Sequence, residues 1–257
     1  MIVARKLTLT ALSGIPLIEP QDDVCAIIAR QLRAEAVELI DGDVIVIAQK
    51  IISKAQGRYL DLEDVEPSAQ AYEFAETIGK DPRHIQAVLS ESTEVVRYRK
   101  NVLIVAHRLG FVMANAGIDE SNIDHAGHAH RVLLLPHDPD GTCVEIKRAM
   151  GREFGVSIGV IINDSFGRPW RNGVVGVALG CAGLPALLSL IGEPDLFGRP
   201  LQTTEIAVAD ELAAAASILM GQGAEGSPVV HIRGYKTEAP SKPAEALVRP
   251  KSMDMFR

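Results

Sequence analysis

Aromatic residues and cysteines are scarce in this sequence. Aromatics make up 4% of the 257 residues, and there are three cysteines. A core with so few aromatics must consist mainly of Val, Ile, Leu and Ala, a composition typical of sheets covered by Ala-rich helices. Cys25, Cys143 and Cys181 lie far apart and form no Cys-x-x-Cys pair, and an odd number cannot all be paired in disulfides. A disulfide-stabilised secreted domain is therefore excluded, and we expect a reducing, cytoplasmic location.

An excess of positive charge and long apolar runs are also missing. The formal net charge is −7, which argues against a general nucleic-acid or membrane-surface binder, because those surfaces are bound through clustered Lys and Arg. No window approaches the roughly 18 apolar residues of a membrane span, and the N-terminal segment lacks the apolar stretch of a signal peptide. We therefore expect small-molecule partners, with no nucleic acid and no membrane.

Hydrophobic residues make up 47% and charged residues 23% of the chain, as in ordinary folded domains. Short β-branched runs bounded by turn residues predict buried strands at 43–48, 102–106, 132–135, 156–162, 174–179 and 229–232. Apolar residues at helical spacing predict helices at 22–34, 67–78, 82–91, 138–153 and 204–220. The fold class is therefore α/β mixed (α+β). Because two helices follow one another between 67 and 91, a regular doubly wound sheet or an eight-fold barrel is not expected.

Domain boundaries are weakly marked. A lobe made of residues 65–100 is a candidate, although no Pro/Gly/Ser linker delimits it. Residues 235–257 contain three prolines and several charges without apolar periodicity. This composition predicts a loosely held C-terminal tail.

Glycine patterns give no familiar phosphate site. The P-loop pattern GxxxxGK[ST] is absent. Gly221, Gly223 and Gly226 fit GxGxxG, but they follow a predicted helix and precede a predicted strand, whereas the dinucleotide fingerprint requires strand, turn and then helix. We interpret them as a loop that ends a helix, so a nucleotide site must be of another design.

Polar residues follow the strand predicted at 43–48. Gln49, Lys50, Ser53 and Lys54 come directly after it, at a position where open α/β sheets present ligand-binding groups. The two lysines can hold phosphate, or they can simply solubilise the exposed face of a short helix. A separate turn at 13–16 offers backbone amides that would complement them.

The stretch GFVMANAGIDESN runs from an apolar strand into Asn115, Gly117, Asp119, Ser121 and Asn122. Small residues followed by a carboxylate suit a metal held close to the backbone. Mg²⁺ and Mn²⁺ favour oxygen ligands, and one or two carboxylates with substrate phosphates and water complete such a site. The alternative is an Asx turn in which Asp119 or Asn122 caps a helix.

The segment VIINDSFGRPWRNG is the most informative one. A buried strand is predicted to end at Asp164 and Ser165, whose side chains can ligate a metal. Arg168 and Arg171 can grip phosphates or carboxylates with planar, always-charged guanidinium groups. Trp170, the only tryptophan, lies between them in a predicted glycine-rich turn. A purely structural role does not account for this combination, which favours a functional site.

Two further segments allow two interpretations each. Residues 203–204 precede an apolar helix and suit its N-cap, while Glu205 can equally ligate a metal. His125, His128 and His130 form a short cluster that can bind a transition metal through imidazoles. Without a nearby Cys, we interpret the cluster as a loop outside the site.

Five ordered blocks resemble the coenzyme F(420)-0:γ-glutamyl ligase family. They are ALSGIPLI, VIVIAQKIISKAQGR, GFVMANAGIDESN, INDSFGRPWRNG and PDLFGRPLQTTEIAVADELAAAA, spread over residues 1–234. The resemblance implies a ligase that joins L-glutamate to the terminal carboxylate of a deazaflavin precursor through an amide bond and can add further glutamates. It also implies GTP as co-substrate, Mg²⁺ or Mn²⁺ at two sites, K⁺ as a further candidate, and an unusual mixed α/β fold in an intertwined homodimer. Residues 1–234 would form the ligase domain, with 235–257 as the tail.

The resemblance also implies roles for individual residues. Nucleotide contacts would be made by Gly14, Ile15, Pro16, Leu17, Gln49, Lys54 and Asn122, with Thr204 near the nucleotide. One metal would lie between Asp119 and Asp164, and a second would use Ser165 and Glu205. The predicted catalytic residues are Asp119, Asp164 and Lys54. Ser165 stands where family members often have Thr, which keeps the hydroxyl, and the histidine loop resembles an insertion.

The mechanism expected from this resemblance passes through an acyl phosphate. The precursor's carboxylate would attack the γ-phosphate of GTP, and the amine of glutamate would then attack the acyl phosphate. Metals and lysines would neutralise charge on the transferring phosphoryl group. Two alternatives use the same residues: a metal-dependent GTP hydrolase or phosphatase with water as acceptor, and a non-catalytic GTP-binding module.

Overall fold

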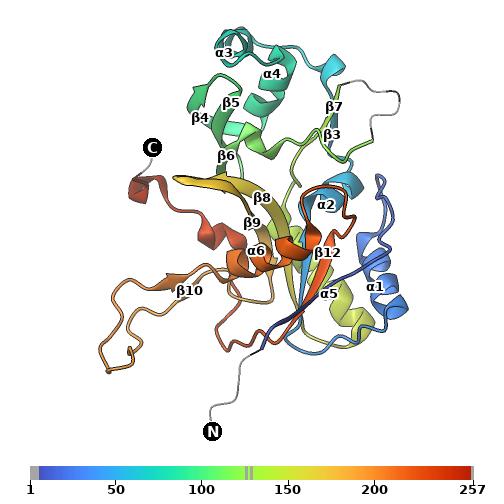
Figure 1. Ribbon diagram of the computed structural model, residues 1–257, viewed down its shortest axis with the longest axis vertical. Helices are drawn as coiled ribbons and strands as arrows, with labels where there is room; N and C mark the ends of the chain where they lie inside the picture. The colour runs from blue at the N-terminus through green and yellow to red at the C-terminus, as the bar shows by residue number, and fades with distance from the viewer. Residues whose placement is uncertain (1–5, 125–126, 128–129, 256–257) are drawn as a thin grey trace.

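A mixed five-stranded sheet forms the centre of the computed structural model, which describes residues 6–124, 127 and 130–255 (Figure 1). Its strands, in spatial order, are β1 (Thr8–Ala11), β12 (Val229–Arg233), β2 (Val44–Ala48), β8 (Gly159–Arg168) and β9 (Arg171–Ala182). Strands β2 and β8 are parallel, and the other neighbours are antiparallel. The carboxyl ends of β2 and β8 therefore meet at one edge of the sheet.

Helices cover both faces of this sheet. On one face, α1 (Val24–Ala34) and α5 (Pro139–Phe154) pack with the alternate strand residues Ile45 and Ile47. On the other face, α6 (Val208–Met220) packs with the intervening Val44 and Val46. Because successive side chains of a strand point to opposite faces, a strand buried on both sides must be apolar throughout. This explains the uninterrupted apolar run VIVIA of β2.

One glycine sets how closely α6 approaches the sheet. A Cβ atom at Gly176 in β9 would lie 2.4 Å from the carbonyl oxygen of Ala213 and 2.2 Å from Ser217 Oγ. Any larger residue would push the helix away from the strand. Glycine is therefore required here by close backbone approach.

A smaller lobe lies at the top of Figure 1. It contains α3 (Ala69–Ile78) and α4 (Pro82–Ser90), followed by the antiparallel sheet of β4 (Ser92–Arg99), β5 (Val102–His107) and β6 (Val112–Ala114). Its apolar cluster extends from Leu62 to Leu134 and is separate from the two clusters around the central sheet. The lobe is thus larger than the predicted 65–100. A short ladder of β3 (Tyr59–Asp61) and β7 (Arg131–Leu133) connects it to the main body.

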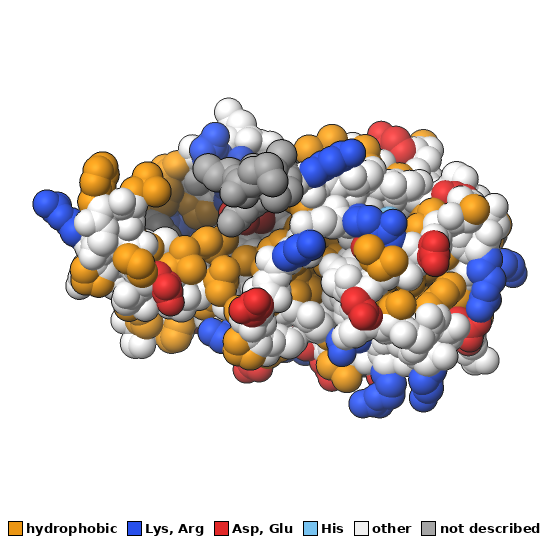
Figure 2. Space-filling view, turned by 90° about the horizontal axis from the view of Figure 1, so that it is seen from below, with side chains coloured by type: hydrophobic (Ala, Val, Ile, Leu, Met, Phe, Trp, Pro, Cys, Tyr) orange, Lys and Arg blue, Asp and Glu red, His pale blue; other side chains and the backbone are white. Residues whose placement is uncertain are grey.

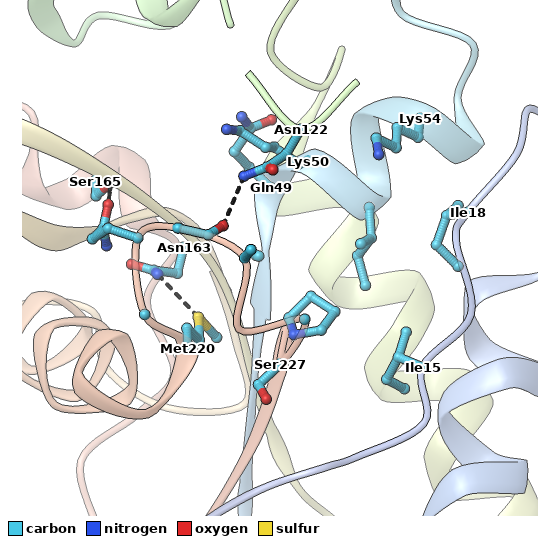
Figure 3. Close-up of a pocket in the computed structure, with 18 of the residues that line it drawn as sticks. Ile15, Ile18, Gln49, Lys50, Lys54, Asn122, Asn163, Ser165, Met220 and Ser227 are labelled. Atoms are coloured by element: carbon cyan, nitrogen blue, oxygen red, sulfur yellow. Dashed lines mark hydrogen bonds between the residues drawn. The ribbon is translucent and has the colours of Figure 1, made fainter. Parts of the chain in front are cut away.

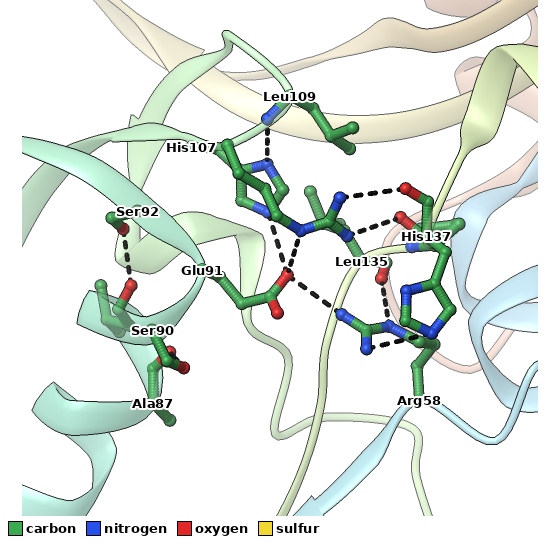
Figure 4. A network of polar contacts seen from close by, with 12 residues as sticks. Arg58, Ala87, Ser90, Glu91, Ser92, His107, Leu109, Leu135 and His137 are labelled. Carbon is green, nitrogen blue, oxygen red and sulfur yellow. Dashed lines mark hydrogen bonds and ion pairs between the residues drawn. The ribbon is translucent and has the colours of Figure 1, made fainter.

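A polar network at Glu91 fastens the lobe to the body (Figure 4). Arg58 Nη2 and Arg108 Nε each donate to Glu91 Oε2 at 3.0 Å, and His107 Nε2 lies 3.4 Å from the same oxygen. Both guanidinium groups also donate to backbone carbonyls, Arg58 to Leu135 and Arg108 to residue 137. Burial opposes ionisation of Glu91, but the contacts with His107 and the two arginines lower its pKa to about 2. Chain segments far apart in sequence are thereby held together by one carboxylate.

Each predicted strand and helix overlaps an observed element, which confirms the α/β mixed class. The remaining elements are short: α2 (Gln49–Ala55), β10 (Leu188–Ser189), β11 (Glu205–Ile206), and 3₁₀ turns at Leu62–Asp64, Asn115–Gly117, Ala244–Leu247 and Lys251–Met253. Two of the boundaries that differ from prediction affect the candidate site. Strand β8 continues to Arg168, because residues 163–168 pair with β9 in a long hairpin. Helix α6 begins at Val208, because Glu205–Ile206 pairs with β10, so neither Thr203 nor Thr204 is its N-cap.

The segment between β10 and β11 forms an arm that projects from the body at the lower left of Figure 1. Large apolar side chains on this arm are exposed: Ile191 by 55%, Leu196 by 99% and Phe197 by 90%. Figure 2 views the molecule from below and shows hydrophobic side chains gathered at its left end, where the arm lies.

The C-terminal segment is not loose up to about residue 248, contrary to prediction. Ala244 is fully buried, and the carboxylate of Asp140 accepts hydrogen bonds from the backbone amides of Ala244, Glu245 and Cys181 at 2.7–3.1 Å. This partly exposed carboxylate of α5 thus fixes the segment, a long-range contact that composition does not reveal. The division at residue 234 itself stays a prediction.

Within the described ranges, no helix is long and apolar enough to cross a membrane.

Candidate functional site

A cavity of about 390 Å³ opens at the carboxyl ends of β2 and β8 (Figure 3). It is lined by residues 15–18, by the end of β2 with the first turns of α2, by Asn122, by residues 163–165 of β8, and by most of the loop 220–228. Ligands in open α/β sheets bind at this position because the strands end there and the connecting segments supply the side chains. The predicted residues Ile15, Pro16 and Leu17 form one wall.

Helix α2 carries two pairs of polar side chains, and the two members of each pair are one helical turn apart. Gln49 and Ser53 are buried, and Ser53 Oγ donates to Gln49 Oε1 at 2.8 Å. Lys50 and Lys54 form the second pair, and both line the cavity. Residues four apart lie on the same face of a helix, so two positive charges approach each other here. Both lysine side chains are partly buried.

The two lysines differ in their partners. Lys50 Nζ lies 3.2 Å from Asp119 Oδ1 and donates to Ser121 Oγ at 3.1 Å. Lys54 makes no ion pair with any residue in the described part of the chain. Burial, and next the charge of Lys50, lower the pKa of Lys54. The charges of Glu19 and Asp124 act in the opposite direction. An ammonium at the cavity wall suits an anionic ligand.

Asp119 is held by contacts from α2. Gln49 Nε2 donates to Asp119 Oδ2 at 2.8 Å while Lys50 pairs with the other oxygen. The backbone of Asp119 forms a two-way bridge with Leu133. Burial raises the pKa of Asp119, and Lys50 and Gln49 oppose that rise. The Asx-turn alternative is not needed, because the side chain has partners in α2.

Asp164 lies on β8 close enough to Asp119 for their charges to interact. Burial, and next the charge of Asp119, raise the pKa of Asp164 to about 7. The only hydrogen bond found for its carboxylate within the described ranges comes from the backbone amide of Ser165, at 2.8 Å. Two carboxylates that share a partly buried place repel each other, and a bound cation would remove that repulsion.

The residues present fit a hard divalent cation. Asp119 and Asp164 provide two carboxylates, and Mg²⁺ or Mn²⁺ completes its ligands with water and phosphate oxygens. No group of three or more His, Cys, Asp and Glu side chains able to hold a metal occurs among the described residues. A dedicated all-protein cage is therefore not formed among these residues, and a cation held by two carboxylates would keep coordination positions for water and phosphate oxygens.

The loop 220–228 contributes groups that sequence reasoning missed. Ser165 Oγ donates to Gln222 Oε1 at 2.7 Å, so a hydroxyl and a carboxamide oxygen lie side by side at the cavity wall. Asn122 Nδ2 donates to the carbonyl of Gly223 at 3.0 Å, which joins the loop to the turn after Asp119 (Figure 3). In the sequence, the GxGxxG match at Gly221, Gly223 and Gly226 was the signal that could have identified this loop as part of the site. It ends a helix, as predicted, but it also lines the cavity.

Other predicted residues lie elsewhere. Glu205 is exposed on β11 and pairs with Ser189 of the arm. Neither Glu205 nor Thr204 lines the cavity of this chain. The predicted metal pair of Ser165 and Glu205 is therefore not brought together there, and Gln222 is the residue beside Ser165. The reason is the β10–β11 pairing, which directs residues 204–206 into the arm.

Three further predictions concern the cavity's surroundings. Gly14 lies just outside the lining, where it adopts a φ of +66°. Arg168 and Arg171 close the β8–β9 hairpin around Trp170, and they too lie outside the lining. His125 and His128 of the histidine cluster fall outside the described residues.

Comparisons with known proteins place this sequence in a family. A model of the family described as "F420-0:Gamma-glutamyl ligase" matches residues 14–234. The chain is 46% identical over 256 residues to the "Coenzyme F420:L-glutamate ligase" of Methanothermobacter thermautotrophicus, covering 98% of this chain and 99% of that relative. This chain belongs to the F420-0:gamma-glutamyl ligase family.

Other family members show similar coverage. The protein of the same name from Methanopyrus kandleri is 44% identical over 245 residues, 93% of each chain, and that from Archaeoglobus fulgidus is 42% identical over 244 residues. All segments that line the cavity fall within the matched residues 14–234. The cavity thus belongs to the part of the chain that defines the family.

Proposed function

We propose that this protein forms an amide bond between the amine of L-glutamate and the terminal carboxylate of a deazaflavin F420 precursor, using GTP and divalent metal. Further γ-linked glutamates are possible products. Relatives that match most or almost all of the chain carry the name coenzyme F420:L-glutamate ligase, which supports the reaction and its two substrates. The three cysteines are free thiols, in keeping with a reducing cytoplasm.

One observation carries the proposal. The carboxylate of Asp164, the ammonium of Lys54 and the glycine loop at 221–226 line a single cavity at the ends of two parallel strands. The carboxylate of Asp119 lies beside it, in contact with the lining residues Gln49 and Lys50. Carboxylates bind the metal of a metal nucleotide, while an ammonium and backbone amides bind its phosphates. Apolar residues 15–18 offer a surface for the base.

The proposed chemistry proceeds in two steps. An oxygen of the precursor's carboxylate attacks the γ-phosphorus, GDP leaves, and an acyl phosphate forms. The amine of glutamate then attacks the acyl carbon, inorganic phosphate leaves, and the amine loses a proton. Metals held by Asp119 with Asp164, and by Ser165 with Gln222, would neutralise charge on the phosphates. Lys54 would contact the same phosphates, and exclusion of water from the cavity would protect the acyl phosphate.

The test is a complete reaction with matched omissions. Protein, precursor, L-glutamate, Mn²⁺ and GTP are incubated, and the precursor is weighed by mass spectrometry. We expect a product heavier by one or more glutamyl units, formed only when all components are present, and slower formation with ATP. GTP turnover without glutamate would support a hydrolase instead. Stable GTP occupancy with no product would support a binding module.

We also propose that two copies of the chain associate through the arm. Ile191, Leu196 and Phe197 expose apolar surface that a second copy would bury. Replacing Leu196 and Phe197 by Ser should convert a dimer to a monomer in light scattering coupled to gel filtration. Replacing the exposed Tyr72 of α3 by Ser is the matched control, and a monomeric wild-type protein would contradict this proposal.

A further inference from the structure

The turn that leads into Asp119 has an unusual backbone. Asn115, Ala116 and Gly117 have φ values of +51°, +53° and +67°, three successive residues in the left-handed region. Glycine adopts this region freely and Asn tolerates it, but Ala does so only at a cost. Such residues persist where surrounding contacts enforce them, and they cluster at functional sites. Asp119 lies two residues after Gly117, which ends this turn.

Packing enforces the middle and the end of the turn. Ala116 is fully buried, and a Cβ atom at Gly117 would lie 2.8 Å from Met113 Cε. The amide of Ile118 donates to the carbonyl of Asn115 at 3.0 Å, which closes the turn. Beyond it, the backbone bridge between Asp119 and Leu133 fixes the exit. At the start of the turn, the side chain of Asn115 is held by a separate hydrogen bond.

The small lobe supplies that hydrogen bond. Lys80, between α3 and α4, donates from Nζ to Asn115 Oδ1 at 3.1 Å. On α4, the His84 side chain is only 6% exposed, and its Nε2 lies 3.0 Å from Glu120 Oε1. Lys80 and His84 therefore contact the chain on both sides of Asp119, at positions 115 and 120. Neither Lys80 nor His84 lines the cavity.

We propose that Lys80 and His84 are positioning residues that hold the left-handed turn and thereby place the carboxylate of Asp119 beside the cavity, against Gln49 and Lys50. The proposal rests on the proposed function, in which Asp119 binds metal. A solvated lysine would point to water or to a carboxylate. Lys80 is half-buried, and although the charge of Glu120 acts on it, its ammonium donates to a neutral amide on a strained backbone, so this contact fixes a conformation.

The first test compares Lys80→Met with Lys100→Met, a matched control at an exposed lysine in the β4–β5 turn of the same lobe. Mn²⁺ affinity is measured by calorimetry, and amide hydrogen exchange is followed in peptides covering residues 113–124. We expect Lys80→Met to bind Mn²⁺ about tenfold more weakly and to exchange faster at Ile118 and Asp119. Lys100→Met should match the wild type in both measurements.

The second test separates positioning from a general structural role. Because glycine adopts φ near +51° without side-chain support, Asn115→Gly should make Lys80 dispensable. We expect Asn115→Gly alone to bind Mn²⁺ within about twofold of the wild type, and adding Lys80→Met to this variant to cause little further loss. An equal tenfold loss in both backgrounds, or no loss from Lys80→Met in the wild type, would overturn the proposal.

The outcomes also distinguish this proposal from the proposed function. If wild-type protein binds Mn²⁺ and ligates glutamate but Lys80→Met behaves like it, only the positioning role fails. If wild-type protein binds no Mn²⁺, the metal assignment fails. The hydrogen-exchange comparison still decides whether Lys80 holds the turn, since faster exchange in Lys80→Met alone supports the role and unchanged exchange overturns it.

Discussion

Replacing Asp164 by Asn should abolish ligation and, without metal, stabilise the fold. The pKa of this carboxyl rises from 3.8 to about 7 because burial and Asp119 disfavour its charge. Each pKa unit corresponds to about 1.36 kcal/mol, so ionised Asp164 costs the folded state at most about 4 kcal/mol. Solvent reaches part of the side chain and screens it, and we expect about 1–2 kcal/mol. For a chain of this size, that is a rise in Tm of about 3–6 °C.

The sign of the pH dependence follows from the raised pKa. Below pH 3.8 both folded and unfolded chains carry a neutral Asp164, and the variant has no advantage. Between pH 3.8 and about 7 the folded chain keeps its proton while the unfolded chain loses it, so wild-type stability falls relative to Asp164→Asn. Above about pH 7 both states are ionised, and the difference stays constant.

Thermal melts in EDTA at pH 4, 5.5, 7 and 8 test this reasoning. Asp64→Asn, at an exposed aspartate on the lobe side, is the matched control and should not shift with pH relative to the wild type. With Mn²⁺ present, the wild type should have a higher Tm than Asp164→Asn, because only the wild type gains stability from binding the metal. An Asp164→Asn protein that melts lower than the wild type at pH 8 in EDTA would refute the claim that this charge is destabilising.

Three further predictions concern charged side chains. Lys54→Met should bind GTP about ten-fold to a hundred-fold more weakly in calorimetry with unchanged melting, because a charge-assisted contact contributes about 1.5–3 kcal/mol; unchanged affinity would assign Lys54 to a solvated face. Replacing His125, His128 and His130 together by Ala should leave ligation rates almost unchanged, and a large loss would place that loop at the site. Glu91→Gln should lower stability at pH 7 by about 2–4 kcal/mol in urea unfolding, because buried guanidinium groups lose their partner. The pKa of Glu91 is about 2 in the folded chain and 4.5 in the unfolded chain. Ionised Glu91 therefore stabilises the folded state at pH values above 4.5, and this contribution disappears as the pH falls towards 2. A Glu91→Gln loss that persisted at pH 2 would contradict this.

The amino-acid sequence by itself determined four of the five central strands, the five longer helices and one half of the site. Apolar alternation and helical spacing are local properties, so β2, β8 and the helices that cover them were predictable from short windows. Lys50, Lys54, Asp119 and Asp164 were identified for the same reason, because each follows or interrupts an apolar strand with groups suited to phosphate or metal.

Only the tertiary structure decided which of these groups meet and what charge they carry. Gln222 lies next to Ser165 although 57 residues separate them, and Glu205 is drawn into the arm by pairing with β10. The raised pKa of Asp164 depends on burial and on Asp119, and the carboxylate of Asp140 holds the C-terminal segment. Each of these facts depends on contacts between distant segments, whose geometry is set by sheet topology and packing, and no local pattern in the sequence encodes it.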